Sequence, residues 1–176
     1  MQPRNLLLAH LAALVASFAV AGLSLPAFAQ QKYLGEFKDW FAYREDQGPE
    51  RTCYIASIPK KEAGKYTSRG ETFILVTHRP GDAKRDVFEL RAGYSYKKQS
   101  KVTLNIDGDV TKLVPVGASA WAETDKIDRA LAAAMTKGRQ MIVTGFSARG
   151  TKTTDTYSLA GFTAAYRAIG RACGVK

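Results

Sequence analysis

The feature that most constrains the fold is an alternation of apolar and polar residues that runs, with interruptions, from Phe37 to Val116. Turn-forming residues at 46–49 and at 107–108 separate the alternating stretches. A period of two places successive side chains on opposite faces of a strand, and Asp-Gly is a strong hairpin signal. Many short strands joined by turns are typical of a β-sandwich or barrel rather than of βαβ units. We therefore predict a mainly β fold.

The alternation also predicts where the strands lie. The stretch 60–70 is basic and contains glycine, so we expect a loop there. After the first long series of strands, a hairpin should cross residues 149–151. The predicted strands cover residues 37–43, 52–58, 72–77, 86–91, 102–106, 110–116, 140–147 and 153–157.

Residues 125–137 break this rhythm, because their apolar side chains recur at helical spacing. Thr124 or Asp125 can cap the start of this helix. Gly138 can end it in the left-handed conformation. We predict an α-helix over these residues.

A second helix is predicted near the C-terminus, at about 159–173, because apolar residues recur there at steps of three and four. Ser158 is a suitable N-cap, and Gly174 a suitable stop. Cys173 falls on the apolar stripe of this helix, which directs its sulfur toward the sheet and the strand that carries Cys53.

The first thirty residues have the pattern of a secretory signal peptide. Arg4 precedes an apolar run over residues 6–23, and Ala27 and Ala29 supply small residues before a cleavage point near Ala29/Gln30. We predict a cleaved leader over 1–29 and a single β-sandwich domain over 30–176. The expected location is the periplasm, with outer-membrane association or secretion as further possibilities.

The charge of the chain then indicates its partners. The formal net charge is +10, and Arg4 is the only charged residue of the leader, so the exported chain carries 10 − 1 = +9. Export argues against nucleic acid as the partner and favours anionic envelope lipids, glycans, or a host or envelope protein. The alternative is a generally basic surface without a specific anion. No second apolar run reaches about 18 residues, so we expect no transmembrane span after the leader.

Cys53 and Cys173 are the two cysteines of the chain. In an oxidising compartment, an even pair is most simply explained by one disulfide. Two buried thiols, or one reactive thiol, are the alternatives. We predict the disulfide.

Catalytic chemistry has little support in the sequence. His78 is the one histidine beyond the leader, which excludes two-histidine zinc patterns and supplies only half of a catalytic triad. Ser147 lies in a stretch similar to a nucleophile elbow, but Arg149 occupies the position of the last glycine. We predict no catalytic residue, no metal and no cofactor.

A cluster of aromatic and cationic residues gives the candidate binding site. Aromatic rings and cations together can bind sugars or headgroups by stacking and by charge. The alternative is an ordinary solvated loop in which lysines protect a strand edge from pairing. The candidate anion- or ligand-binding residues are Tyr94, Tyr96, Lys97, Lys98 and Lys101.

A set of short motifs follows in order along nearly the whole exported chain. The most specific of them is 155–162, which is followed by Ala172-Cys173. The others are Asp39-Trp40, 51–54, 78–80, Gly93-Tyr94, 120–122, 135–138 and 147–151. In this order the motifs resemble those of the invasion-associated locus B family.

The resemblance implies an immunoglobulin-like β-sandwich with helical additions. It also implies an exported protein of alphaproteobacteria, periplasmic or associated with the outer membrane, in a family named for an association with host-cell entry. The family offers no catalytic residues to carry over.

The first hypothesis is therefore a non-enzymatic envelope protein that binds an envelope or host component and contributes to host-cell invasion. One alternative is a cell-wall hydrolase that uses paired carboxylates as acid and base, whose separation only the fold can reveal. Another is a periplasmic inhibitor or chaperone-like partner of a second protein.

Overall fold

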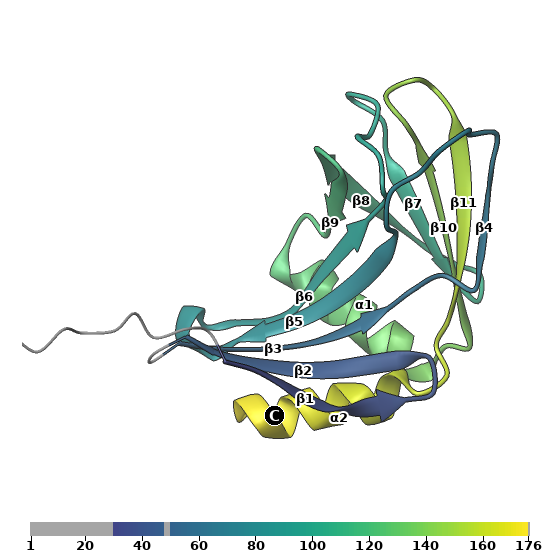
Figure 1. Cartoon of the computed structure of the whole chain (residues 1–176). Coiled ribbons are helices and arrows are strands. Elements are labelled where there is room, and N and C mark those ends of the chain that lie inside the picture. The colour runs from purple at the N-terminus through teal and green to yellow at the C-terminus, as the bar shows by residue number, and fades with distance from the viewer. Residues whose placement is uncertain (1–29, 48–49, 176) are drawn as a thin grey trace, which may run out of the picture.

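The computed structural model describes residues 30–47 and 50–175, so the predicted leader and its cleavage point lie outside the described residues. Within them, eleven antiparallel strands form one sheet in the order β1-β2-β3-β5-β6-β9-β8-β7-β10-β11-β4 (Figure 1). The strands are β1 (Gln30–Phe37), β2 (Trp40–Gln47), β3 (Glu50–Ser57), β4 (Lys61–Gly64), β5 (Phe73–Arg79), β6 (Lys84–Arg91), β7 (Val102–Ile106), β8 (Asp109–Val116), β9 (Ser119–Trp121), β10 (Gln140–Phe146) and β11 (Lys152–Ser158).

The sheet bends sharply between two halves, as Figure 1 shows. One half contains β1, β2, β3, β5 and β6, and the other contains β7, β10, β11 and β4. Strand β8 joins them, because residues 109–113 pair with β7 whereas residues 114–116 pair with β9. The two halves share one hydrophobic core, which is a sandwich-like arrangement.

Two helices complete the core. Helix α1 (Asp125–Lys137) packs on β6, and α2 (Phe162–Cys173) packs on β2 and β3. Trp40 of β2 meets Phe162 of α2 edge to face, with 5.0 Å between the ring centroids. The predicted mainly β fold with two helices is confirmed.

Helix α1 has the predicted bounds, and its predicted N-cap is confirmed. The Thr124 hydroxyl accepts a hydrogen bond from the Ile127 amide at 3.3 Å. The predicted left-handed ending at Gly138 is wrong, because that residue is extended, with φ −75° and ψ 164°. Glycine is needed there for space: a Cβ would lie 2.6 Å from Ile106 Cγ2 and 2.8 Å from Leu159 Cδ1.

Helix α2 starts three residues later than predicted, and Ser158 is not its N-cap. Ser158 still belongs to β11, and its carbonyl accepts a hydrogen bond from the Trp40 indole at 3.1 Å. The chain turns at Gly161, which has φ +93°, before the helix begins. The predicted stop at Gly174 is confirmed, in the left-handed conformation.

Two predictions in the N-terminal part of the chain, one of a strand and one of a loop, are also wrong in part. The predicted strand 37–43 is interrupted by a hairpin turn at Lys38 and Asp39, between β1 and β2. Lys38 adopts a positive φ of 58°, and the Asp39 amide donates to the Ala160 carbonyl at 3.3 Å. The predicted loop 60–70 contains β4, which pairs with β11.

A short 3₁₀ turn (Pro80–Asp82) links β5 to β6.

Candidate functional site

Three basic segments meet at one end of the half-sheet that contains β7, β10, β11 and β4. We call these segments the basic loop end. They are residues 64–69, which start at the end of β4, residues 93–101 before β7, and residues 146–152, which run from the last residue of β10 to the first of β11. The pairing of β7 with β10, of β10 with β11 and of β11 with β4 places them side by side. None of the three segments contains Asp or Glu. Their cations are Lys65, Arg69, Lys97, Lys98, Lys101, Arg149 and Lys152.

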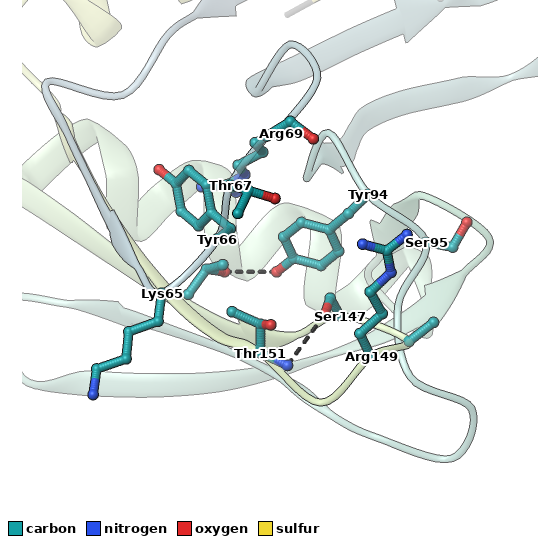
Figure 2. Close-up of a pocket in the computed structure, with 12 residues that line it drawn as sticks. Lys65, Tyr66, Thr67, Arg69, Tyr94, Ser95, Ser147, Arg149 and Thr151 are labelled. Carbon is teal, nitrogen blue, oxygen red and sulfur yellow. Dashed lines mark hydrogen bonds between the residues drawn. The ribbon is translucent and has the colours of Figure 1, made fainter.

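A pocket of about 460 Å³ opens between these segments (Figure 2). Figure 2 shows the guanidinium of Arg149 beside Tyr94 and Ser95, whereas the side chain of Lys65 points away from them. The remaining wall is rich in hydroxyl groups, which can donate hydrogen bonds to an anion or a sugar. The hydroxyl-bearing lining residues are Tyr66, Thr67, Ser68, Tyr94, Ser95, Ser147, Thr151 and Thr153.

A buried ion pair supports one wall of the pocket. Arg69 donates to both carboxylate oxygens of Asp155, at 2.6 and 2.7 Å, and each side chain is only 3% exposed. Arg69 also donates to the Ala92 carbonyl at 2.7 Å. Burial disfavours the charged guanidinium, but the hydrogen bonds and attraction from Asp155 outweigh it and raise the pKa of Arg69. Because this charge is already paired, Arg69 positions the pocket rather than offering a free cation.

Aromatic rings hold the same guanidinium in place. The Arg69 carbon Cζ lies 5.1 Å from the centroid of Tyr94 and 5.7 Å from that of Tyr66, which is within the range of cation–π contacts. Burial raises the pKa of Tyr94, so this phenol stays protonated, and its oxygen shares a hydrogen bond of 2.6 Å with the Thr153 hydroxyl.

Gly145 makes room for the floor of the pocket. A Cβ at this position would lie 2.7 Å from Tyr96 Cε1 and 3.0 Å from the Tyr94 hydroxyl. The two tyrosine rings meet edge to face, 5.2 Å apart. Sequence reasoning gave no role to Gly145, because the contact joins residues that are distant in the chain.

The structure separates the five predicted binding residues. Tyr94 lines the pocket, whereas Tyr96 is 7% exposed and lies in the core beneath it. Lys97, Lys98 and Lys101 line an adjoining hollow of about 550 Å³ together with Phe146 and Gly150. The lysines therefore flank the pocket, Tyr94 contributes to its wall, and Tyr96 supports it from within.

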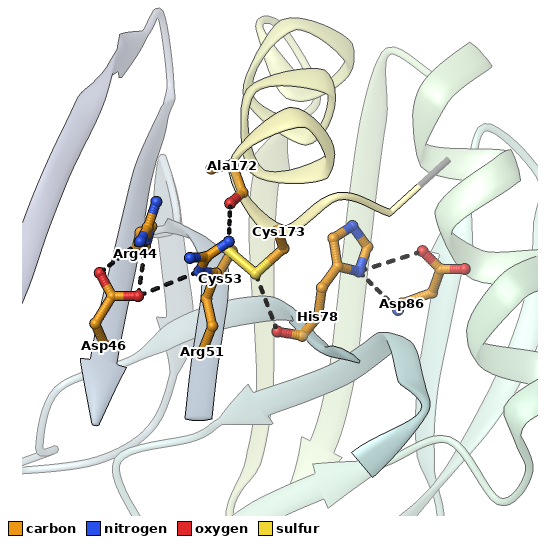
Figure 3. The surroundings of a disulfide bond; sticks show 8 residues. All are labelled: Arg44, Asp46, Arg51, Cys53, His78, Asp86, Ala172 and Cys173. Carbon is orange, nitrogen blue, oxygen red and sulfur yellow. Dashed lines mark hydrogen bonds and ion pairs between the residues drawn. A yellow bond between two sulfur atoms is a disulfide. The ribbon is translucent and has the colours of Figure 1, made fainter. Parts of the chain in front are cut away.

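The Cys53–Cys173 disulfide is confirmed, with 6.0 Å between the Cα atoms and 120 residues between the two positions (Figure 3). It joins β3 to the last residue of α2. Arg51 reinforces the connection, since its guanidinium donates to the Ala172 carbonyl at 3.4 Å. Such a bond is typical of proteins that fold in an oxidising compartment.

His78 lies in the core beside this disulfide and away from the tyrosine-lined pocket, in a separate hollow with residues of α2. Its Nδ1 accepts a hydrogen bond from the Asp86 amide at 3.1 Å. Burial lowers the pKa of His78, so the ring is neutral near pH 7. The Asp86 carboxylate accepts from Tyr166 at 2.5 Å and from Arg85 at 3.0 Å.

No group of three or more His, Cys, Asp or Glu side chains that can hold a metal ion occurs among residues 30–47 and 50–175. His78 is also the one histidine in this part of the chain. Neither α1 nor α2 has the length and apolar character of a membrane-spanning helix.

The fold and the pocket define a class: a small, disulfide-bonded, mainly β protein with a basic, hydroxyl-rich surface pocket. The family model for invasion associated locus B (IalB) proteins matches residues 40–170, and the chain belongs to this family. The resemblance drawn from the sequence motifs is thereby confirmed. No curated protein and no solved structure matches the chain.

Proposed function

We propose that this protein is exported to the cell envelope and binds, without catalysing a reaction, an anionic group of an envelope or host component at the basic loop end. The observation that carries the proposal is the concentration of six cations, besides the paired Arg69, in three adjacent segments that contain no carboxylate. The family name supports a contribution to host-cell invasion as part of the same proposal.

The chemistry of the pocket favours an anion attached to a sugar or a headgroup. Arg149 and the flanking lysines attract a phosphate or carboxylate, and the neighbouring hydroxyls can hydrogen-bond to it. The ring of Tyr94 adds an apolar surface against which a sugar ring can pack. Phosphorylated glycolipids and acidic glycans combine these groups.

Export is supported by two independent features. The first thirty residues have a leader pattern. The disulfide is compatible with an oxidising location such as the periplasm.

The test compares retention on vesicles that contain anionic phospholipid, and on lipopolysaccharide, at low salt. We expect the triple variant K97Q/K98Q/K101Q and the variant R149Q to lose most of the retention of the wild type. The reason is that binding depends on attraction between exposed charges, which dissolved salt screens. The matched control is K126Q/R129Q/K137Q, which removes three cations from exposed positions on α1. Equal retention of all variants on both surfaces would contradict the proposal.

A cell-wall hydrolase is the competing function, and the one observation in its favour is a separate groove lined by Glu45, Glu62 and Glu71. Incubation of the pure protein with purified peptidoglycan distinguishes the two. Release of soluble fragments, abolished by E45Q or E71Q, would overturn the non-enzymatic role. A periplasmic inhibitor or chaperone-like role would instead appear as a protein captured by crosslinking in intact envelopes.

A further inference from the structure

A second surface has the opposite charge to the basic loop end. A hollow of about 910 Å³ lies on the outward face of β2, β3 and β5. Three glutamates line it, and no Lys or Arg does. In a chain of formal charge +10, a groove whose charged side chains are all negative favours a positive partner. We call it the acidic groove.

The floor of the acidic groove is apolar. Side chains alternate along β2, so that Trp40 and Ala42 face α2 whereas Phe41 and Tyr43 face the groove. Figure 1 shows α2 along this half of the sheet. The ring of Tyr43 stacks on that of Tyr54 at 5.2 Å. The remaining apolar lining residues are Ala56, Ile58, Pro59, Phe73 and Leu75.

Two of the carboxylates are free to bind a cation. Glu45 accepts hydrogen bonds from the neutral groups of Tyr54 at 3.1 Å and of Gln31 at 3.3 Å, which orient it. Glu71 is exposed. Neither Glu45 nor Glu71 takes part in an ion pair within the described residues, whereas Glu62 lies 3.7 Å from the Arg69 guanidinium.

We propose that the acidic groove binds a cationic amphipathic peptide. Its lysine or arginine side chains would meet Glu45 and Glu71, and its apolar side chains would cover the aromatic floor. A cation can also lie against the tyrosine rings, which strengthens its attraction to the groove. Ile58, 62% exposed at the rim, offers a further apolar contact that the monomer leaves in water.

Charge complementarity favours a cationic peptide over two other occupants, an acidic glycan or headgroup and a second copy of the chain. The three carboxylates disfavour the acidic glycan or headgroup proposed for the basic loop end. A second copy of the chain could present its own basic loop end, but that surface is mainly hydroxyls and cations and matches the rim better than the apolar floor. The proposal uses none of the residues of the basic loop end, so either can fail alone.

The experiment measures fluorescence anisotropy of a labelled peptide of alternating lysine and leucine at low salt. We expect the wild type to bind this peptide and not to bind the matched peptide that has glutamate in place of lysine. The double variant E45Q/E71Q should bind about tenfold more weakly, because a half-buried and an exposed charge contact are lost. The control E50Q/E123Q removes two exposed glutamates elsewhere and should bind like the wild type.

I58S tests the apolar contact independently of charge and should weaken binding several-fold. Circular dichroism and the unfolding midpoint of each variant, unchanged from the wild type, show that loss of binding is not loss of fold. Three results would overturn the proposal: no binding by the wild type, equal weakening by E45Q/E71Q and E50Q/E123Q, or equal binding of the acidic peptide. Concentration-dependent self-association that E45Q/E71Q abolishes would also overturn it, and would assign the groove to a second copy.

Discussion

At the scale of single residues, the pair Arg69–Asp155 links the loop after β4 to β11 and shapes the wall of the basic pocket. Its two partners are 86 positions apart in the sequence and almost fully buried. Breaking a buried pair leaves an unpaired charge in the core, which is more costly than replacing both partners. The same pair therefore makes a sharp test of the structure.

We expect Asp155→Asn to lower the free energy of unfolding by about 3–5 kcal/mol, because the buried Arg69 guanidinium keeps its charge and loses its counter-charge. The double variant R69M/D155L should recover a large part of this loss. Urea unfolding of both variants measures the difference. A single variant as stable as the wild type would show that the pair is not formed.

A second residue-scale prediction concerns pH. Burial lowers the pKa of His78 from 6.5, so the unfolded chain takes up a proton at a higher pH than the folded protein does. Stability is therefore lost as the pH falls below about 6.5, down to the lower folded pKa, by at most about 1.4 kcal/mol per pH unit. Between pH 7 and 5, H78Q should lose less stability than the wild type.

The measurement for His78 is the free energy of unfolding against pH, compared between H78Q and the wild type. Asp39, Asp46 and Asp125 have lowered pKa values, so they affect stability mainly at more acidic pH. Burial raises the pKa of Asp128, so this residue adds stability as the pH falls, and it does so equally in H78Q and the wild type. Parallel curves for H78Q and the wild type between pH 7 and 5 would contradict the prediction.

At the scale of elements, local signals predicted the bounds and the N-cap of α1, whereas they placed the start of α2 three residues too early. The Thr124 cap and the apolar spacing of α1 are contained within the helix and its first turn. The start of α2 depends instead on Trp40, which holds the Ser158 carbonyl, and on the turn at Lys38, which packs beside Gly161. These partners are more than a hundred residues away, so periodicity alone cannot detect them.

The candidate site also combines local signals, which the sequence shows, with distant contacts, which it does not. The basic residues 97, 98 and 101 are close together in the sequence and could be predicted from it. Their association with Arg149 and Lys65 depends on the order of β7, β10, β11 and β4. The sequence pattern also could not show that Tyr94 lines the pocket while Tyr96 is buried.

Gly161 gives the prediction at the element scale. It combines φ +93° with a backbone neighbour, because a Cβ there would collide with the Phe37 carbonyl oxygen. Gly174 also has a positive φ, of +67°, but no atom lies within 4 Å of its Cβ position. We expect G174A to cost about 1–2 kcal/mol from backbone strain alone, and G161A to cost clearly more. Thermal and urea unfolding measure the stability of the two variants. An equal loss of stability in both would mean that the backbone moves to relieve the contact with the Phe37 carbonyl oxygen.

At the scale of the whole molecule, the disulfide connects an early strand to the end of the last helix, so most of the chain lies between its two cysteines. A cross-link stabilises mainly by restricting the unfolded chain, and long loops gain most. Both sulfurs are in the core, where Cys53 is fully buried and Cys173 is 6% exposed. The bond thus supplements the packing of α2, through Phe162 and Ile169, on β2 and β3.

We expect C53A/C173A to lower the free energy of unfolding by about 2–5 kcal/mol and to raise the exposure of α2 to hydrogen exchange more than that of α1. Helix α1 is the internal control, because it lies within the closed loop but packs on β6. Alkylation and mass spectrometry without reductant should label no thiol in the wild type. Two labelled thiols, or equal exchange in both helices, would show that the cross-link does not hold the end of the chain on the sheet.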